Sequence, residues 1–317
     1  MTRANSSFSN PDHQRTYDEQ GFVVVPILTA EEAQVLRAQV EDRIPSIPFI
    51  NDPQQGMYNS TFDPDFPQCI PAEFDALMNE RLGALLDGYR YPGACVLAKI
   101  AGAGRLALHQ HQPLTPNIYS KILHYWMTLE DVDEGHCALR VVPRSHRILR
   151  HVQSFSSPPY FADFKEVLEA EFAVAVPMRA GEALLMDGSL LHGSCPNRSD
   201  RAALRVFSAI LPEAEPLCIL TESEGPTFDA YAVEGKQVDP GLHCMCEGNV
   251  EGLEHMGRLD SRNTQLTLAE FEQLLKMDRR IEPGFDPIDV VRATAARSTS
   301  DSFWQRVGQR LRSREIA

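Results

Sequence analysis

The sequence predicts a mainly β protein, an antiparallel jelly roll with helices packed against one face. Two amphipathic helical segments come first, and from about residue 94 the pattern changes to short apolar runs separated by turn-rich pieces. The chain has 317 residues, of which 43% are hydrophobic and 23% charged, so it can bury a sizeable core.

The helices of the first part are marked by a cap and by apolar spacing. Thr29 and Glu32 form a capping box, and the helix behind it is expected over about residues 30–44. A second helix is expected over about residues 72–88, where leucines recur at helical spacing. Strands are expected at Phe22–Val25, Ala94–Ile100, Leu106–His111, Lys121–Leu129, Ala138–Val142, Phe172–Pro177, Glu182–Met186 and Ala203–Leu211.

The domain organisation is expected to be simple. Residues 1–16 are polar and are expected to form a disordered N-terminus. Residues 17–317 then form a single domain, in which residues 213–317 are a C-terminal extension or a lid over the barrel mouth. Residues 213–262 are expected to be irregular, and the extension closes with helices at Leu266–Met277 and Ser302–Arg312.

Charge and cysteine content exclude several classes of protein. The formal net charge of −14 argues against nucleic acid or an anionic membrane as a partner. The seven cysteines are scattered and odd in number, which is typical of a reducing compartment. Because the sequence shows neither a signal peptide nor a long apolar window, we expect a soluble cytoplasmic protein that acts on a small molecule.

One histidine pair and a distant histidine predict a metal site. Side chains two apart on a strand point to the same face, so His109 and His111 would present two imidazoles side by side. His192 is the best candidate for a third ligand. Two close ligands and one distant ligand are typical of non-haem iron centres with open coordination positions. The plainer interpretation of the pair is two surface histidines on a strand.

Further motifs accompany these histidines, and together they resemble a known family. The segments that carry the resemblance are Gly21–Val25, Lys99 with Ala101–Gly104, His109–His111, Trp126–Leu129, Leu139–His146 and His192–Arg201. In these segments the chain is similar to the phytanoyl-CoA dioxygenase-like branch of the iron(II)/2-oxoglutarate oxygenases, over roughly residues 17–212.

The resemblance implies a fold, a chemistry and a set of ligands. The fold would be a double-stranded β-helix, the cupin-like form of the jelly roll. The protein would be a dioxygenase that uses Fe(II), 2-oxoglutarate and O2 to hydroxylate, desaturate or cyclise a small, natural-product-like molecule. His109, His111 and His192 would bind the metal.

The resemblance also implies residues for the cosubstrate. Arg201 would anchor the distal carboxylate of 2-oxoglutarate, with Arg205 in reserve because it lies on the same face of the strand. Ser194 and Asn197 would be supporting hydrogen-bond donors, although Asn197 also suits the turn that it occupies. Lys99 would face the cosubstrate or solvate the end of its strand. For either arginine the plainer interpretation is a salt bridge at the rim.

His111 departs from the family pattern, which has aspartate at this position. The replacement makes the site one charge unit more positive and removes an oxygen ligand. Three interpretations stay open. The three-histidine centre still chelates 2-oxoglutarate; or it chelates an anionic substrate directly and oxidises it without 2-oxoglutarate; or the domain is an inactive binding protein. Asp187 is an alternative carboxylate, although a structural role in its turn is the simpler interpretation.

One other cluster has the chemistry of a metal site. His243, Cys244, Cys246 and His255 lie close together in the sequence, and such residues can bind zinc. Two cysteines one residue apart rarely form half of a tetrahedral site, so a loop that folds over the barrel is the simpler interpretation. The sequence contains no glycine-rich phosphate loop and no nucleophile elbow of a serine hydrolase.

Overall fold

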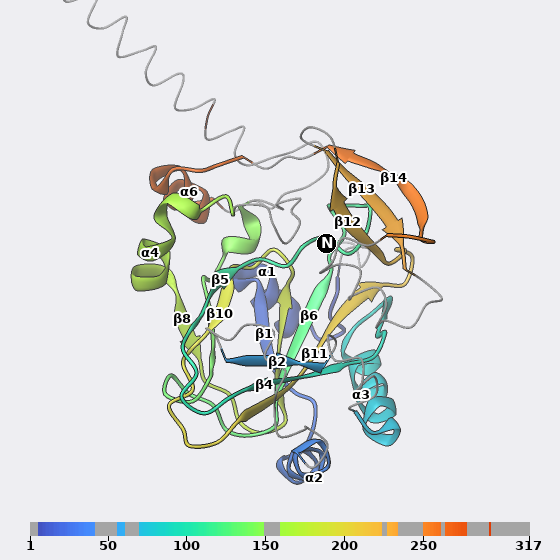
Figure 1. The fold of residues 1–317 in the computed structure, drawn as a ribbon, viewed down its shortest axis with the longest axis vertical. Coiled ribbons are helices and arrows are strands. Elements are labelled where there is room, and N and C mark those ends of the chain that lie inside the picture. Colours follow the sequence, from blue (N-terminus) through green and yellow to red (C-terminus); the bar gives the residue numbers. More distant parts are fainter. Residues whose placement is uncertain are drawn as a thin grey trace, which may run out of the picture.

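The computed structural model describes residues 6–41, 56–60, 70–148, 159–223, 227–233, 250–260, 264–277 and 292. They form mainly antiparallel β-structure with a few flanking helices, as the sequence predicts (Figure 1). A larger and a smaller sheet pack against each other, and a third sheet lies to one side.

The larger sheet has seven strands. In spatial order its main path is β1 (Phe22–Pro26), β9 (Glu182–Asp187), β6 (Leu123–Thr128), β11 (Ala203–Pro212), β4 (Cys95–Lys99) and β2 (Met57–Asn59), with β3 (Tyr89–Arg90) paired to β11. The N-terminal strand β1 pairs antiparallel with β9, so that segments far apart in the sequence form one edge of the sheet.

The smaller sheet has four strands and carries the histidines singled out in the sequence. Its order is β5 (Leu106–His109), β10 (His192–Ser194), β7 (Leu139–Val141) and β8 (Val174–Val176). The strand expected over 106–111 ends at His109, so His111 lies just beyond it. Strand β10 was not expected from the sequence, because its residues His192, Gly193 and Ser194 show no apolar alternation.

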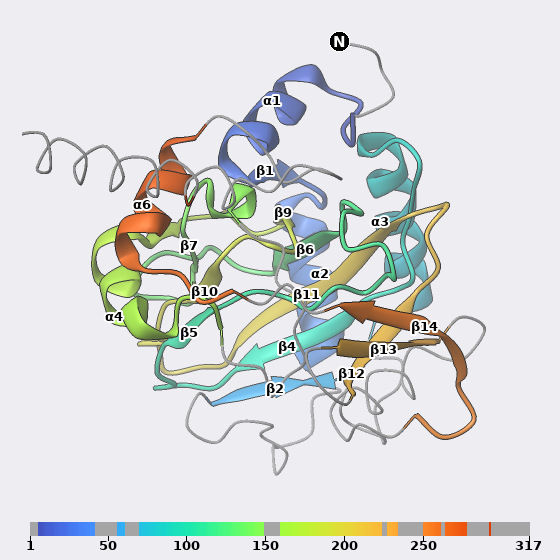
Figure 2. The same ribbon diagram turned by 90° about the horizontal axis from the view of Figure 1, so that it is seen from above.

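Two apolar cores lie on opposite faces of the larger sheet. Leu97, Trp126, Leu184 and Phe207 point inward and pack against residues of the smaller sheet such as Val141. The other face packs against three helices, α1 (Pro11–Gln20), α2 (Ala30–Glu41) and α3 (Ala72–Leu85) (Figure 2). The strand alternation therefore decides which side chains reach the interior between the sheets.

The expectation of a disordered N-terminus does not hold for residues 6–16. The side chain of Asn10 caps α1 by accepting a hydrogen bond from the backbone N–H of Asp12, and Pro11 stands at the first helical position. Phe8 is only 2% exposed and Tyr17 is buried in the same core. This polar segment is ordered because two aromatic side chains attach it to the barrel.

The irregular excursion expected over residues 213–262 is also corrected. Within its described part, β12 (Cys218–Glu222), β13 (Thr227–Ala232) and β14 (Glu254–Asp260) form a three-stranded antiparallel sheet. Phe228 and Leu220 form its apolar face, against which Ile118 packs. The sheet lies on the opposite side of the molecule from α6 in both views (Figures 1 and 2).

The predicted helix over 266–277 is confirmed as α6 (Leu268–Lys276), with a capping box formed by Thr267 and Glu270. Phe271 of this helix packs on Phe164, and both belong to a second core beside the smaller sheet. The remaining short helices are Ser145–Arg147, Ala162–Phe164, Lys165–Val167 (α4) and Leu168–Phe172. The helix expected over 302–312 and residues 243–246 of the cysteine-rich cluster lie outside the described residues.

Of the helices that the structure describes, none has the length and apolar character to cross a bilayer.

Candidate metal centre

The pairing of β5 with β10 brings the three predicted histidines together. His109 and His192 are directly opposite each other in the register of these strands. The backbone N–H of His111 donates to the carbonyl of Gly188, 3.1 Å away, which holds this residue beside the pair. One ring nitrogen from each of the three histidines lies within 4.8 Å of the others. Three imidazoles therefore converge on one point between the sheets.

Backbone carbonyls fix the orientation of two of the rings. Nδ1 of His109 lies 3.0 Å from the carbonyl of Ala107, and Nδ1 of His192 lies 2.9 Å from that of Leu190. Because a carbonyl only accepts, each Nδ1 carries the hydrogen, and each Nε2 keeps its lone pair. This is the outer hydrogen bond that metal-binding histidines commonly make.

The separation between the rings fits two ligands of a common cation. Nε2 of His111 and Nε2 of His192 are 2.9 Å apart. Two nitrogens that bind a metal at about 2.1 Å and at a right angle to each other are about 3 Å apart. The three rings thus fit a divalent first-row metal, for which imidazole is a suitable ligand.

The histidines are also in the right protonation state to bind a metal. Burial lowers the pKa of His109, and it lowers the pKa of His111 and of His192 well below the usual 6.5. Neighbouring imidazoles lower the pKa of His111 and His192 further. The rings are therefore neutral near pH 7, with lone pairs available for a cation.

Asp187 has a structural role rather than a position in this cluster. Its Oδ2 accepts a hydrogen bond from the hydroxyl of Tyr17, and its Oδ1 accepts from both the backbone N–H and the hydroxyl of Ser189. The cluster within the described residues contains histidines alone.

A fourth histidine stands beside the cluster and was given no role from the sequence. His124 of β6 is 2% exposed, and its ring centroid lies 3.9 Å from that of His111. Burial lowers its pKa to about 3. Neither ring nitrogen has a hydrogen-bond partner among the residues described. Its position two residues before the inward-facing Trp126 is the sequence signal that could have found it.

Lys99 and Ser194 lie together inside the barrel. Lys99 is 5% exposed, and its Nζ donates to the hydroxyl of Ser194 at 2.9 Å and to the carbonyl of Cys195 at 2.8 Å. Burial lowers the pKa of Lys99 to about 8. Ser194 and His192 are two residues apart on β10, so their side chains point to the same face of the smaller sheet. The ammonium group of Lys99, which donates to Ser194, therefore lies on the face that carries the metal centre.

Asn197 shapes its turn. Its side-chain amide donates to the carbonyls of Lys99, Ile100 and Arg201, and its Oδ1 accepts from Ser199. Since both donor hydrogens are engaged by the backbone, Asn197 braces the loop that carries the distal histidine.

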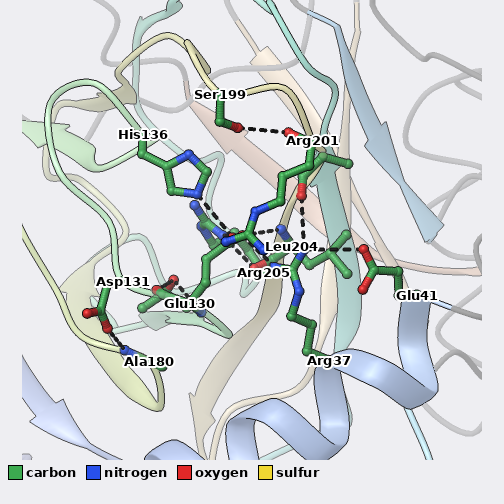
Figure 3. A network of polar contacts seen from close by, with 12 residues as sticks. Arg37, Glu41, Glu130, Asp131, His136, Ala180, Ser199, Arg201, Leu204 and Arg205 are labelled. Carbon is green, nitrogen blue, oxygen red and sulfur yellow. Dashed lines mark hydrogen bonds and ion pairs between the residues drawn. The ribbon is translucent and has the colours of Figure 1, made fainter.

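The two candidate arginines differ in position. The side chain of Arg201 is 58% exposed, whereas that of Arg205 is 3% exposed (Figure 3). Arg205 lies in the strand face that points inward, two residues before Phe207, and its guanidinium carbon is 5.0 Å from the ring centroid of Trp126. Both arginines contact Glu130, a buried carboxylate that the sequence did not single out.

A pocket opens beside His111 and His124. It is lined mainly by amide, hydroxyl and apolar side chains without a formal charge. Its other members include Gln110, Gln112, Asn117, Ile118, Ser120 and Ile122. Ile118 also packs on the third sheet, so the appended strands support one wall of this pocket.

His146 and His255 lie away from the cluster. The ring centroid of His146 lies 6.3 Å from that of Tyr17. His255 is an exposed residue of β14, with Nε2 lying 3.0 Å from a carboxylate oxygen of Asp229.

An inward-facing cluster of neutral histidines in a jelly roll is a suitable site for a non-haem metal. Residues 17–205 match the phytanoyl-CoA dioxygenase (PhyH) family, and the chain belongs to that family. It is thus an oxygenase of the non-haem iron class, and Fe(II) and 2-oxoglutarate are the cofactors of the family. No curated protein matches the chain.

Solved structures share the fold. The α-ketoglutarate-dependent carbocyclase SnoK from nogalamycin biosynthesis is 21% identical, with a TM-score of 0.52 over 66% of this chain and 86% of its own. HygX from Streptomyces hygroscopicus, solved with nickel and 2-oxoglutarate, is 16% identical, with a TM-score of 0.49 over 65% of this chain and 88% of its own. The likeness to SnoK shows the jelly-roll fold.

Proposed function

We propose that this protein oxidises a small organic molecule of the natural-product kind at a three-histidine iron centre, with 2-oxoglutarate as cosubstrate. His109, His111 and His192 would bind the metal. The observation that carries the proposal is the convergence of three neutral imidazoles in an interior that also holds two buried cations, Lys99 and Arg205.

The buried cations can neutralise the second carboxylate of a dicarboxylate. When 2-oxoglutarate chelates the metal through its keto acid end, its second, distal carboxylate is left to be neutralised. Arg205 is buried on the inward face of β11, whereas Arg201 is mostly exposed, so we assign the anchoring role to Arg205. Lys99 of the larger sheet and Ser194 of the smaller sheet are hydrogen-bonded to each other and form a second polar group in the interior.

When bound, iron and 2-oxoglutarate supply the oxidation of a substrate C–H bond by O2, with release of succinate and carbon dioxide. The chain itself orients the reactants and excludes water. Trp126 and Phe207 line the interior with apolar surface, and Phe207 lies 5.4 Å from the ring of His111. The uncharged pocket beside His111 would admit the substrate, with its amides as hydrogen-bond partners.

Anaerobic titration tests this proposal. Iron(II) should bind at one equivalent, and 2-oxoglutarate should then produce a metal-to-ligand charge-transfer band in the visible spectrum. Iron binding without such a band would contradict the use of 2-oxoglutarate. Failure to bind iron would contradict the metal centre itself.

A second function is favoured by one observation, the lack of a carboxylate in the metal cluster of the described residues. Three neutral ligands leave the full charge of the metal for an anionic, chelating substrate. In that case the protein would be a dioxygenase that does not use 2-oxoglutarate. Oxygen uptake on addition of substrate alone, together with the missing charge-transfer band, would support this alternative.

A further inference from the structure

Glu130, directly after β6, is a buried carboxylate that the proposed function leaves unused. Four cationic or basic side chains surround it (Figure 3). Oε1 lies 2.8 Å from Nη1 of Arg37 and 2.9 Å from Nη1 of Arg205, while Oε2 lies 3.1 Å from Nη2 of Arg201 and 3.0 Å from Nε2 of His136.

The carboxylate stays ionised in this position. Burial raises the pKa of Glu130, but the neighbouring cations, Arg205 foremost, lower the pKa to about 2. The backbone N–H of Leu204 also donates to Oε1 at 3.0 Å. Glu130 therefore carries a negative charge, and several contacts fix its position. Its carboxylate can in turn fix the orientation of the guanidinium of Arg205.

The contacts of Arg205 leave one edge of its guanidinium open. Its Nη1 is taken by Glu130 and by the carbonyl of Leu204, 2.6 Å away. Its Nε and Nη2 are buried and have no hydrogen-bond partner in the part of the chain that the structure describes. These two nitrogens form one edge of the planar group, the edge that donates two parallel hydrogen bonds to a carboxylate.

Leaving a buried donor without a partner is unfavourable, so two such donors on one guanidinium indicate a missing acceptor. The side chain lies on the interior wall that also carries Phe207, next to the ring of His111. An anionic ligand in the interior is the acceptor that this geometry fits.

We propose that Glu130 is a positioning residue, which holds Nη1 of Arg205 so that the Nε–Nη2 edge receives the distal carboxylate of 2-oxoglutarate. This inference rests on the proposed function. Glu130 acts through Arg205 and touches no reactant. Without it, the guanidinium gains rotational freedom that must be lost again when the cosubstrate binds.

The test is cosubstrate affinity in the Glu130→Gln variant, measured from the charge-transfer band in the iron(II)-loaded protein without oxygen. The dissociation constant for 2-oxoglutarate should rise at least about tenfold. Pyruvate has the same keto acid end but no distal carboxylate, so its dissociation constant and the iron stoichiometry should stay within about twofold. A merely structural defect would weaken both ligands alike.

Glu32→Gln is the matched control. Glu32 pairs with Arg81 at 2.6 Å, and its pKa is likewise lowered to about 2, first by the hydrogen bond from Arg81. The pair lies outside the barrel, between α2 and α3. The control removes one Glu–Arg pair outside the barrel and should leave the affinity for 2-oxoglutarate unchanged.

A double-mutant cycle with Arg205→Gln shows whether Glu130 acts through Arg205. The double variant should bind 2-oxoglutarate no more weakly than Arg205→Gln alone, and additive losses would overturn the inference. If Glu130→Gln does not fold, Glu130→Asp is the second variant, because it keeps the charge and moves the carboxylate away from Arg205. It should weaken the binding of 2-oxoglutarate several-fold relative to the binding of pyruvate.

Failure of the proposed function and failure of the role of Glu130 would give different experimental results. If the unmodified protein binds iron and gives no band with 2-oxoglutarate, the proposed function fails and the role of Glu130 falls with it. If the band forms and Glu130→Gln or Glu130→Asp leaves the affinity for 2-oxoglutarate unchanged, only the role of Glu130 is overturned.

Discussion

At the scale of single residues, His111 decides the character of the metal centre. Its Nε2 lies 2.9 Å from that of His192. A neutral imidazole in this place leaves the bound metal with its full positive charge. The affinity of the centre for anionic chelators should therefore depend on this one side chain.

His111→Ala should abolish stoichiometric iron binding, because only two of the three converging imidazoles would be left. His111→Asp should retain iron, because it restores a carboxylate with two histidines. Metal analysis after anaerobic loading and desalting measures both. His255→Ala, at an exposed residue of β14, is the control and should bind iron as the unmodified chain does. Unchanged stoichiometry in His111→Ala would show that His111 is not a ligand.

The two arginines give a second prediction at this scale. Arg205→Gln should weaken 2-oxoglutarate by about 10- to 100-fold, because charged hydrogen bonds are worth roughly 1.5–3 kcal/mol. Arg201→Gln should change the affinity by no more than about threefold, because an exposed ion pair contributes little. Titration of the charge-transfer band distinguishes them. If Arg201→Gln weakened the binding of 2-oxoglutarate more than Arg205→Gln does, the anchor would be Arg201.

The sequence could identify residues but not their partners. His109, His111 and His192 were found because strand spacing and a distant third ligand form a pattern. Nothing in the sequence could choose between Arg201 and Arg205, since burial depends on where β11 begins. Glu130 carries no motif, because its importance arises from side chains contributed by three separate segments.

At the scale of elements, the short strand β10 places His192 opposite His109 of β5. Gly193 lies between His192 and Ser194, where β10 passes close to β5. A Cβ at Gly193 would come within 2.5 Å of the carbonyl oxygen of Leu106. The two strands can approach this closely because residue 193 has no side chain.

Gly193→Ala should therefore lower the free energy of unfolding by about 1–3 kcal/mol, because the strands must separate to admit the methyl group. It should also weaken metal binding, since His192 would move away from His109. Thermal unfolding and metal titration measure the two effects. In the control, Gly83→Ala in α3, the new Cβ has no atom within 4 Å and should stabilise the helix by about 0.5–1 kcal/mol. Equal stability of both variants would contradict this account.

Elements with a clear apolar pattern were predictable, whereas polar ones were not. The helices α2 and α3 and the strands β4, β6, β9 and β11 have apolar patterns long enough to recognise. Helix α1 was missed because its sequence is polar, although Asn10 followed by Pro11 is a helix-start signal. The third sheet was missed in part because β14 follows β13 only after residues 233–253 of the sequence.

At the scale of the whole molecule, burying several neutral histidines makes stability depend on pH. In the unfolded chain each histidine has a pKa near 6.5, whereas in the fold the pKa of His124 is about 3 and those of His111 and His192 are well below 6.5. The unfolded state therefore binds more protons below pH 6.5. The stabilisation is present above that pH and is lost as the pH falls.

The melting temperature of the metal-free protein should fall between about pH 7.5 and about pH 5.5, because each such histidine costs up to about 1.4 kcal/mol per pH unit. His124→Phe should show a smaller decrease, since it removes one of these groups while keeping an aromatic ring against Phe207. Scanning calorimetry across the pH range measures this. A melting temperature that does not change with pH would contradict the burial of neutral rings.

The register that sets His109 opposite His192 also has a consequence for biogenesis. His111 and His192 are 81 residues apart in the sequence, and they meet only after β5 and β10 have paired. With these histidines as the proposed ligands, a nascent or partly folded polypeptide would lack the coordination geometry. Cofactor insertion would then follow the pairing of the two strands, and refolding the chain with and without iron would show whether the metal enters only after folding.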